Sequence, residues 1–209
     1  MSHKGILAVV SGFSGAGKGT LMRELLARHS RQYALSISAT TRKPRTGEEH
    51  GREYFFITRE EFEKMIEADA LIEHACYVGN YYGTPKSYVL EQMEAGKDVI
   101  LEIEIQGALK VKEKFPDTLL LFVTPPSADV LEQRLRGRGT ETDEVIRDRL
   151  KRAVEEAEYM EAYDYILVND ELDLCVEEMH RLIQAQHQKT SQNLEFIAEM
   201  KTGLSRLSL

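Results

Sequence analysis

The amino-acid sequence predicts an α/β protein whose core is a parallel β-sheet flanked by helices. Residues 6–10 form an unbroken apolar run of strand length, and a segment with apolar residues at helical spacing follows the glycine-rich stretch 12–20. Three later, largely apolar runs, at residues 98–104, 118–123 and 163–168, are typical of buried strands. The segments between these runs predict a small mixed α/β insertion and a helical lid added to the sheet.

The glycine-rich stretch predicts a phosphate-binding loop (P-loop). It has the pattern G-x-x-x-x-G-K, from Gly12 to Lys18, between a strand and a helix as this pattern requires. Glycines let backbone N–H groups approach phosphate oxygens, the helix directs its positive end at the same anion, and Lys18 adds a mobile positive charge. A glycine-rich structural turn is the alternative, but the register of strand, lysine and helix favours phosphate binding. The residues predicted to contact a nucleotide here are Gly12, Phe13, Ser14, Gly15, Ala16, Gly17, Lys18, Gly19 and Thr20.

The end of this loop departs from the usual pattern, in which Ser or Thr directly follows the lysine. Here Gly19 has that position and Thr20 comes next. The hydroxyl group that holds Mg²⁺ is therefore expected one residue later, at Thr20, unless the metal ion keeps more of its water ligands.

Composition and charge exclude several classes of partner. The chain has 209 residues, of which 42% are hydrophobic and 30% charged, and its formal net charge is −8. This charge argues against a general binder of nucleic acid or of anionic membranes, whereas a nucleotide site needs only a local basic patch. We therefore expect no nucleic-acid partner and no membrane partner.

The cysteines and the N-terminus predict a cytoplasmic protein. Cys76 and Cys175 are far apart and lack metal-ligand spacing, which is typical of free thiols in a reducing compartment. No apolar run approaches membrane-spanning length, and residues 1–4 lead straight into a strand rather than into a signal sequence.

The first half of the insertion is mostly irregular. A short second core strand is predicted at residues 34–38, followed by a polar, basic stretch at 38–48 that Pro and Gly residues interrupt. Residues 53–57 predict a strand. Thr58 and Glu61 then form a capping box that begins a helix.

The second half of the insertion returns the chain to the core. A strand is predicted at 71–77, a turn-rich aromatic stretch at 79–85, and a helix at 86–95 that ends at Gly96. Residues 39–95 are therefore predicted to form a unit separate from the parallel sheet.

The core strand at 98–104 carries two acidic side chains at its end. Glu102 and Glu104 follow an apolar run, as in the metal-side strand of a phosphoryl-transfer enzyme. The same pattern fits an edge strand with solvent-facing acids, because the two residues alternate with period two. The next strand, at 118–123, is followed by Pro125 and Pro126.

A basic segment after these prolines predicts a mobile lid. Arg134, Arg136 and Arg138 surround Gly137 and Gly139, and a long helix begins after Thr142. Its predicted buried face consists of Val145, Ile146, Leu150, Ala153, Val154, Ala157 and Met160, and its other face includes Arg147, Arg149 and Arg152. A solvated helix paired with its own acids is the alternative, but glycine hinges in a chain with a phosphate loop favour a lid over a polyphosphate, spanning residues 126–155.

The last core strand, at 163–168, ends in Asn169 and Asp170, and a helical tail follows. From Gln184 the sequence becomes polar, and this segment is available for subunit contacts in a possible homo-oligomer. The predicted core comprises residues 1–38, 96–125 and 156–209.

A second group of residues in the insertion predicts a pocket for a nucleoside monophosphate. Arg42 and Arg45 lie three residues apart in a broken loop, and guanidinium groups suit a second phosphate, to which Tyr54 and Tyr82 can donate hydroxyl groups. Three other residues can recognise a base: Ser38, Glu73 and Thr84. A carboxylate such as that of Glu73 accepts two parallel N–H bonds from the N–H-rich edge of guanine, which adenine does not offer.

With these residues in view, the sequence resembles the bacterial guanylate kinases, which are P-loop nucleoside monophosphate kinases. The resemblance extends from about Gly5 to Leu182. It is carried by residues 40–56, which match the family signature throughout, and by the stretches 79–84 and 134–139.

The resemblance implies roles for individual residues. Guanine contacts are implied for Ser38, Glu73 and Thr84, and contacts to the GMP phosphate for Arg42, Arg45, Tyr54 and Tyr82. Arg134, Arg138 and Arg149 match lid arginines that reach the transferring phosphate, and Asn169 falls in the region that meets the adenine. Glu102 and Glu104 stand where the family usually has two aspartates, so we expect them at the substrate, with Glu102 and Thr20 near the metal ion. The residues expected to act in catalysis are Lys18, Arg42, Arg134, Arg138 and Arg149.

The implied reaction is ATP + GMP ⇌ ADP + GDP with Mg²⁺, with dGMP as a further acceptor. Two alternatives stay open at this point. A kinase for another monophosphate such as AMP is suggested by Gly19 and Thr20, which match the loop ending of adenylate kinases. A non-catalytic guanylate-kinase-like binding module is disfavoured, since such modules tend to lose the loop glycines and lysine that are present here.

Overall fold

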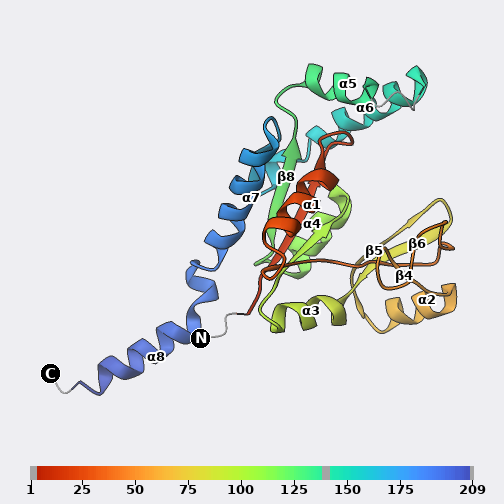
Figure 1. Cartoon of the computed structure of the whole chain (residues 1–209). Helices are drawn as coiled ribbons and strands as arrows, with labels where there is room; N and C mark the ends of the chain where they lie inside the picture. Colours follow the sequence, from red (N-terminus) through yellow and green to blue (C-terminus); the bar gives the residue numbers. More distant parts are fainter. Residues whose placement is uncertain (1–3, 138–141, 208–209) are drawn as a thin grey trace.

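A computed structural model of the protein describes residues 4–137 and 142–207. A five-stranded sheet forms the body, and a four-stranded sheet lies beside it, to the right in Figure 1. Every strand pairing in the larger sheet is parallel. The prediction of an α/β fold with a parallel core is confirmed.

The larger sheet has the strand order β2-β7-β1-β8-β9. Its strands are β1 (Leu7–Gly12), β2 (Tyr33–Leu35), β7 (Asp98–Glu102), β8 (Leu119–Thr124) and β9 (Tyr165–Val168). β1 lies at the centre because its apolar side chains are removed from water on both faces of the sheet. Since all five strands run in the same direction, their carboxyl ends meet at one edge, where both the glycine-rich loop and Glu102 lie.

Helices cover both faces of this sheet. α1 (Lys18–Arg28) and α7 (Leu172–Gln186) contact each other, and α4 (Ile105–Lys114) contacts β1 and β8. The connections β1–α1–β2 and β7–α4–β8 cross the sheet in opposite directions, so right-handed crossovers put α1 and α4 on opposite faces. α3 (Lys86–Glu94) packs on β7 and buries Val89 in the same core.

The smaller sheet has the order β4-β3-β6-β5 and mixes parallel and antiparallel pairs. Its strands are β3 (Ala39–Thr40), β4 (Phe55–Phe56), β5 (Leu71–Tyr77) and β6 (Asn80–Pro85). α2 (Arg59–Glu67) begins at the predicted capping box, in which the Thr58 hydroxyl accepts from the Glu61 N–H and the Glu61 carboxylate accepts from the Thr58 N–H at 2.7 Å. Phe62 on this helix is fully buried in a small core of its own.

Three sequence predictions of local structure need correction. Residues 79–85 were expected to be turn-rich, but only the turn at Val78 and Gly79 is irregular, and Asn80–Pro85 pairs with β5 and β3. Ala39–Thr40 is a strand rather than loop, because it pairs with both β4 and β6. α4 was not predicted, since its buried side chains are few and Gly107 interrupts them.

The predicted lid contains two helices, α5 (Ala128–Arg136) and α6 (Asp143–Ala157), which lie together at the top of Figure 1. The Thr142 hydroxyl caps α6, as the sequence predicts. Ile146 and Ala153 are buried, but Val145 and Val154 are 42% and 69% exposed, so the predicted buried face is too wide. Successive helical residues turn by about 100°, which carries these valines off the stripe that faces the body.

Two 3₁₀ turns connect the last elements of the chain. The first (Met160–Ala162) precedes β9, so Met160 lies beyond the end of α6, and the second (Thr190–Gln192) follows α7. α8 (Leu194–Ser205) buries no residue and extends away from the sheets in Figure 1. Within residues 4–137 and 142–207, no helix is long and apolar enough to cross a membrane.

Candidate active site

The glycine-rich loop lies between the end of β1 and the start of α1, packed tightly against β8. Gly12, Gly15 and Gly17 have φ angles of 149°, 98° and 89°, which side-chain-bearing residues rarely adopt. A Cβ atom at Gly12 would lie 2.0 Å from the carbonyl oxygen of Val123. The glycines are therefore required both by backbone conformation and by the approach of the neighbouring strand.

Lys18 folds back over this loop. Its Nζ donates to the carbonyl oxygens of Gly12 at 2.7 Å and Phe13 at 3.1 Å, and its side chain lines a cavity of about 690 Å³. Gly17 is the N-cap of α1, and the first turn of that helix contains no acidic residue. Positive charge from the lysine and from the helix terminus is thus directed into one cavity, as an anion site requires.

Two of the predicted lid arginines reach the loop or its support. Arg149 on α6 donates from Nη1 to the Ser14 hydroxyl at 2.6 Å, and it lines the same cavity as Lys18. Arg134 on α5 donates to the carbonyl oxygen of Asn169 at 2.8 Å. The third, Arg138, lies outside the described residues.

Asn169 lies beneath the loop, with only 6% of its surface exposed. Its Nδ2 donates to the carbonyl oxygen of Ala16 at 2.8 Å, and the same atom would be 2.5 Å from a Cβ at Gly17. The contact therefore supports the backbone of the loop, and the implied contact of Asn169 with adenine stays a prediction.

A second cavity, of about 300 Å³, lies between the two sheets. The sequence-predicted residues that line it are Ser38, Tyr54, Glu73, Tyr82, Glu102 and Glu104. At its wall the fully buried Thr84 donates its hydroxyl to the Glu73 carboxylate at 2.8 Å. The structure thus brings together residues that are up to 66 positions apart in the sequence, from Ser38 to Glu104. They come from β4, β5, β6 and β7 and from the segments beside these strands.

The two cavities share a wall. Five residues line both cavities: Tyr54, Tyr77, Glu102, Ile103 and Glu104. Tyr77 was not predicted, because one tyrosine in a strand carries no signal of function. Burial raises the pKa of the Glu102 carboxyl, and the positive charge of Lys18 acts in the opposite direction.

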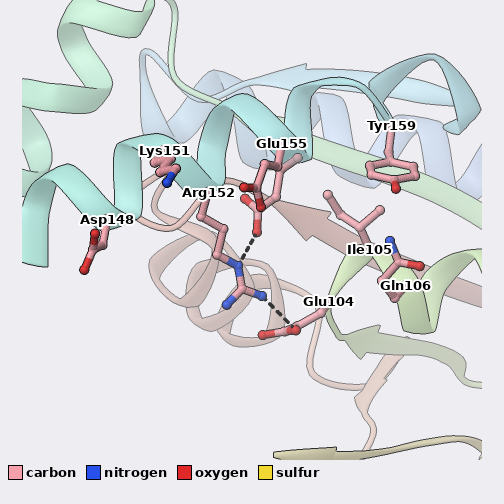
Figure 2. A pocket seen from close by; sticks show the side chains of 9 residues that line it. Glu104, Ile105, Gln106, Asp148, Lys151, Arg152, Glu155 and Tyr159 are labelled. Atoms are coloured by element: carbon pink, nitrogen blue, oxygen red, sulfur yellow. Dashed lines mark hydrogen bonds and ion pairs between the residues drawn. The ribbon is translucent and has the colours of Figure 1, made fainter.

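The other predicted glutamate, Glu104, is the N-cap residue of α4 and does not continue the strand. Its carboxylate pairs with Arg152 of α6 at 2.9 Å, as Figure 2 shows. Glu102 and Glu104 thus both line the two cavities although their side chains have different surroundings, and their contact with a substrate stays a prediction.

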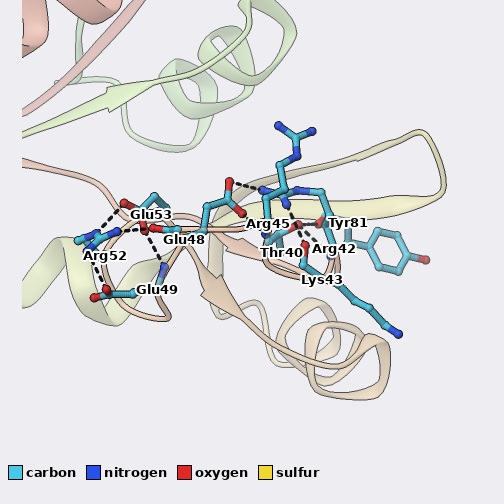
Figure 3. A network of polar contacts seen from close by, with 10 residues as sticks. Thr40, Arg42, Lys43, Arg45, Glu48, Glu49, Arg52, Glu53 and Tyr81 are labelled. Atoms are coloured by element: carbon cyan, nitrogen blue, oxygen red, sulfur yellow. Dashed lines mark hydrogen bonds and ion pairs between the residues drawn. The ribbon is translucent and has the colours of Figure 1, made fainter.

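Arg42 and Arg45 are not among the described residues that line either cavity. Figure 3 shows the network that holds them: Arg42 pairs with Glu48 at 2.9 Å, and the same glutamate accepts from the Arg45 backbone N–H at 2.7 Å. The Arg42 guanidinium lies 5.4 Å from the ring of Tyr54, which does line both cavities. The loop thus keeps the two arginines beside the site rather than in it.

The residues near Lys18 fit a magnesium ion that enters with a polyphosphate. Among the described residues, no group of three or more His, Cys, Asp or Glu side chains is placed to hold a metal ion. Mg²⁺ commonly uses one or two protein oxygens together with substrate phosphates and water. The carboxylate of Glu102 lines the cavity and can supply one such oxygen, whereas Thr20, exposed in the first turn of α1, is not among the described residues that line it. The role of Thr20 at the metal ion stays a prediction.

Comparisons with known proteins give the family. The family model described as guanylate kinase matches residues 4–186. The chain belongs to the guanylate kinase family. A guanylate kinase of Streptococcus thermophilus is 51% identical to this chain over 187 residues, which cover 90% of each chain. A guanylate kinase of Bacillus anthracis is 48% identical over 203 residues, which cover 97% of this chain and 99% of the other. The crystal structure of guanylate kinase from Anaplasma phagocytophilum has a TM-score of 0.71 and 31% identity, covering 95% of each chain.

The cavity between the two sheets should respond to pH through Glu73, which is predicted to accept hydrogen bonds from guanine. Burial raises the pKa of this carboxyl above its ordinary value of 4.5, while hydrogen bonds from Thr84 act in the opposite direction. Guanine N–H groups need the ionised form as acceptor, so lowering the pH from about 8 to about 5 should weaken GMP binding. Calorimetric titration of GMP at several pH values measures this. Glu73→Gln is the control, because it retains only the dependence that comes from the phosphate of GMP, which ionises near pH 6. Identical pH profiles in the two proteins would contradict the assignment.

Proposed function

We propose that the protein transfers the γ-phosphoryl group of ATP to GMP, giving ADP and GDP. One observation supports this most directly: a cavity lined by Lys18 and the glycine-rich loop shares a wall with a cavity lined by Glu73. A donor triphosphate and an acceptor monophosphate held in these cavities would meet at their common boundary. Membership in the guanylate kinase family supports the same reaction.

The loop is the donor site. Its backbone N–H groups and the amino terminus of α1 bind the phosphates of ATP, and Lys18 exchanges its bonds to the Gly12 and Phe13 carbonyls for phosphate oxygens. Arg149, already bonded to Ser14, adds positive charge on the opposite side of the cavity. Arg134 and Asn169 hold the loop from below, and Arg138 completes the predicted set.

The cavity between the sheets is the acceptor site. Glu73 accepts hydrogen bonds from the N–H-rich edge of guanine, with Thr84 and Ser38 beside it. Tyr54 and Tyr82 donate to the phosphate of GMP. Arg42 and Arg45 approach this phosphate when the loop 41–48 turns toward the cavity, where a dianionic phosphate is a stronger partner than Glu48.

Catalysis then consists of positioning and charge stabilisation. The GMP phosphate is itself the nucleophile and is largely ionised at neutral pH, so no general base is required. Lys18 and Arg149 stabilise the charge that spreads over the transferring group. Glu102, with Thr20 as predicted, would hold a magnesium ion bound with ATP, and that ion would neutralise phosphate charge. Closure of the lid and of the insertion excludes water, which would otherwise hydrolyse ATP.

We divide the chain as predicted. Residues 39–95 form the GMP-binding insertion and residues 126–155 the lid, both of which move, and the remaining residues form the core. We also propose that the protein works in the cytoplasm on small-molecule substrates. The exposed apolar side chains of α8 are the part of its surface that would serve a homo-oligomer.

A panel of monophosphates tests this function. With ATP and Mg²⁺, we expect GMP to be the preferred acceptor, dGMP to be accepted, and AMP to give little turnover in a coupled assay of ADP release. A preference for AMP would favour the alternative suggested by Gly19 and Thr20. Binding of GMP without any turnover would favour the non-catalytic module.

A further inference from the structure

An ion pair joins the lid to the wall of the acceptor cavity. Arg152 on α6 contacts Glu104, the N-cap of α4, at 2.9 Å, and its Nε contacts Glu156 one helical turn away at 3.1 Å (Figure 2). One guanidinium group is therefore held by two carboxylates from two separate elements. The planar fork of arginine suits such a bridge, which a lysine cannot reproduce.

This ion pair matters for where it lies, beside both cavities, rather than for its contribution to stability. The side chains of Arg152 and Glu104 are 48% and 73% exposed, and ion pairs with this exposure contribute little to the stability of the fold. Glu104 nevertheless lines both the acceptor cavity and the donor cavity, and Arg152 lines the donor cavity. Arg149, three residues earlier on the same helix, contacts the phosphate loop through Ser14. α6 thus touches the donor loop and the acceptor wall with adjacent turns.

The pair also restricts a flexible side chain. A glutamate side chain loses rotamer freedom when it is ordered, and a carboxylate that is already ordered avoids this loss when a ligand binds. The Glu156 side chain, only 19% exposed, in turn holds the Arg152 guanidinium in place. Glu104 is therefore oriented through a chain of contacts that begins on α6.

We propose that Arg152 is a positioning residue for the acceptor nucleotide. It holds the Glu104 carboxylate at the wall shared by the two cavities, so that the position of α6 over the donor site affects binding at the acceptor site. This inference rests on the proposed function, and Arg152 was not among the residues predicted from the sequence to act at the site.

The test is a double-mutant cycle with steady-state kinetics in the full chain. We expect Arg152→Gln and Glu104→Gln each to raise the KM for GMP about 3- to 10-fold, with the KM for ATP and kcat changed less than about twofold. The double variant should be no worse than the more impaired single variant, because both changes remove the same contact. Arg152→Lys should restore only part of the affinity for GMP. Lys151→Gln, which removes the same charge one residue away, is the matched control and should leave both KM values unchanged.

Other outcomes overturn the inference. Additive effects in the double variant, equal losses for ATP and GMP, or the same loss in Lys151→Gln would each show that Arg152 does not act through Glu104. So would a wild-type KM for GMP in Arg152→Gln. A wild-type protein that does not phosphorylate GMP would instead overturn the proposed function, which separates the two failures.

Discussion

Replacing Lys18 with alanine is expected to lower kcat by at least about 100-fold while the protein stays folded. The amino group lies at the carbonyl oxygens of Gly12 and Phe13, on the wall of the donor cavity, where the phosphates of ATP are proposed to bind. Its loss removes a positive charge from the place where negative charge develops during transfer, and electrostatic groups of this kind contribute several kcal/mol to transition-state stabilisation. Coupled turnover assays with ATP and GMP measure the effect.

The fold should survive this change because the cavity is open to water and the loop has other supports. Asn169 still donates to Ala16, and Gly12 still packs against β8. Thermal unfolding of the variant should therefore stay close to that of the wild type. Arg23→Ala, which removes an exposed positive charge from the same helix, is the matched control. Turnover within about threefold of the wild type in Lys18→Ala would remove the loop from the mechanism.

Replacing Glu73 with glutamine is expected to weaken GMP binding about 10- to 1,000-fold and ATP binding hardly at all. The wild-type carboxylate is partly buried, accepts from Thr84, and lines the cavity with its remaining acceptor positions. Glutamine has nearly the same shape, but its NH₂ group is a donor and would face the N–H groups of guanine. A buried donor facing a donor leaves both groups without a partner, which is more costly than losing one hydrogen bond.

Calorimetric titration of each nucleotide separates this role from a structural one. Glu94→Gln, on the exposed side of α3, changes the same net charge and should leave both affinities unchanged. Equal losses for GMP and ATP in Glu73→Gln would mean that the residue supports the fold rather than recognising the base.

Local sequence signals predicted much of the fold. The buried strands β1 and β8 follow from continuous apolar runs, and the beginning of α2 follows from the capping box of Thr58 and Glu61, in which every contact lies within three residues. β3 was missed because its two residues form a strand only by pairing with β4 and β6, which lie elsewhere in the chain. β6 was missed although it pairs with the neighbouring β5 across the turn at Val78 and Gly79, because its Asn, Gly and Pro residues are typical of turns.

In the candidate site, too, local features were predicted and the positions of distant side chains were not. The glycine-rich turn between a strand and a helix was predicted correctly, because its backbone conformation is a local property, whereas phosphate binding there stays a prediction. The positions of Arg42 and Arg45 were not predictable, since residue type alone cannot show that Glu48 holds them beside the cavities. Their role at the GMP phosphate stays a prediction.

The sequence by itself determined the chemistry available to this protein: an amide-rich loop with a lysine, arginines near glycines, and a carboxylate predicted to recognise guanine. Only the tertiary structure decided which of these groups meet. Asn169 supports Ala16 across 153 positions, Arg149 reaches Ser14 across 135, and Arg152 reaches Glu104 from a different helix. Such contacts depend on how helices pack on the two sheets, and packing energy is spread over many apolar side chains rather than written in any short motif.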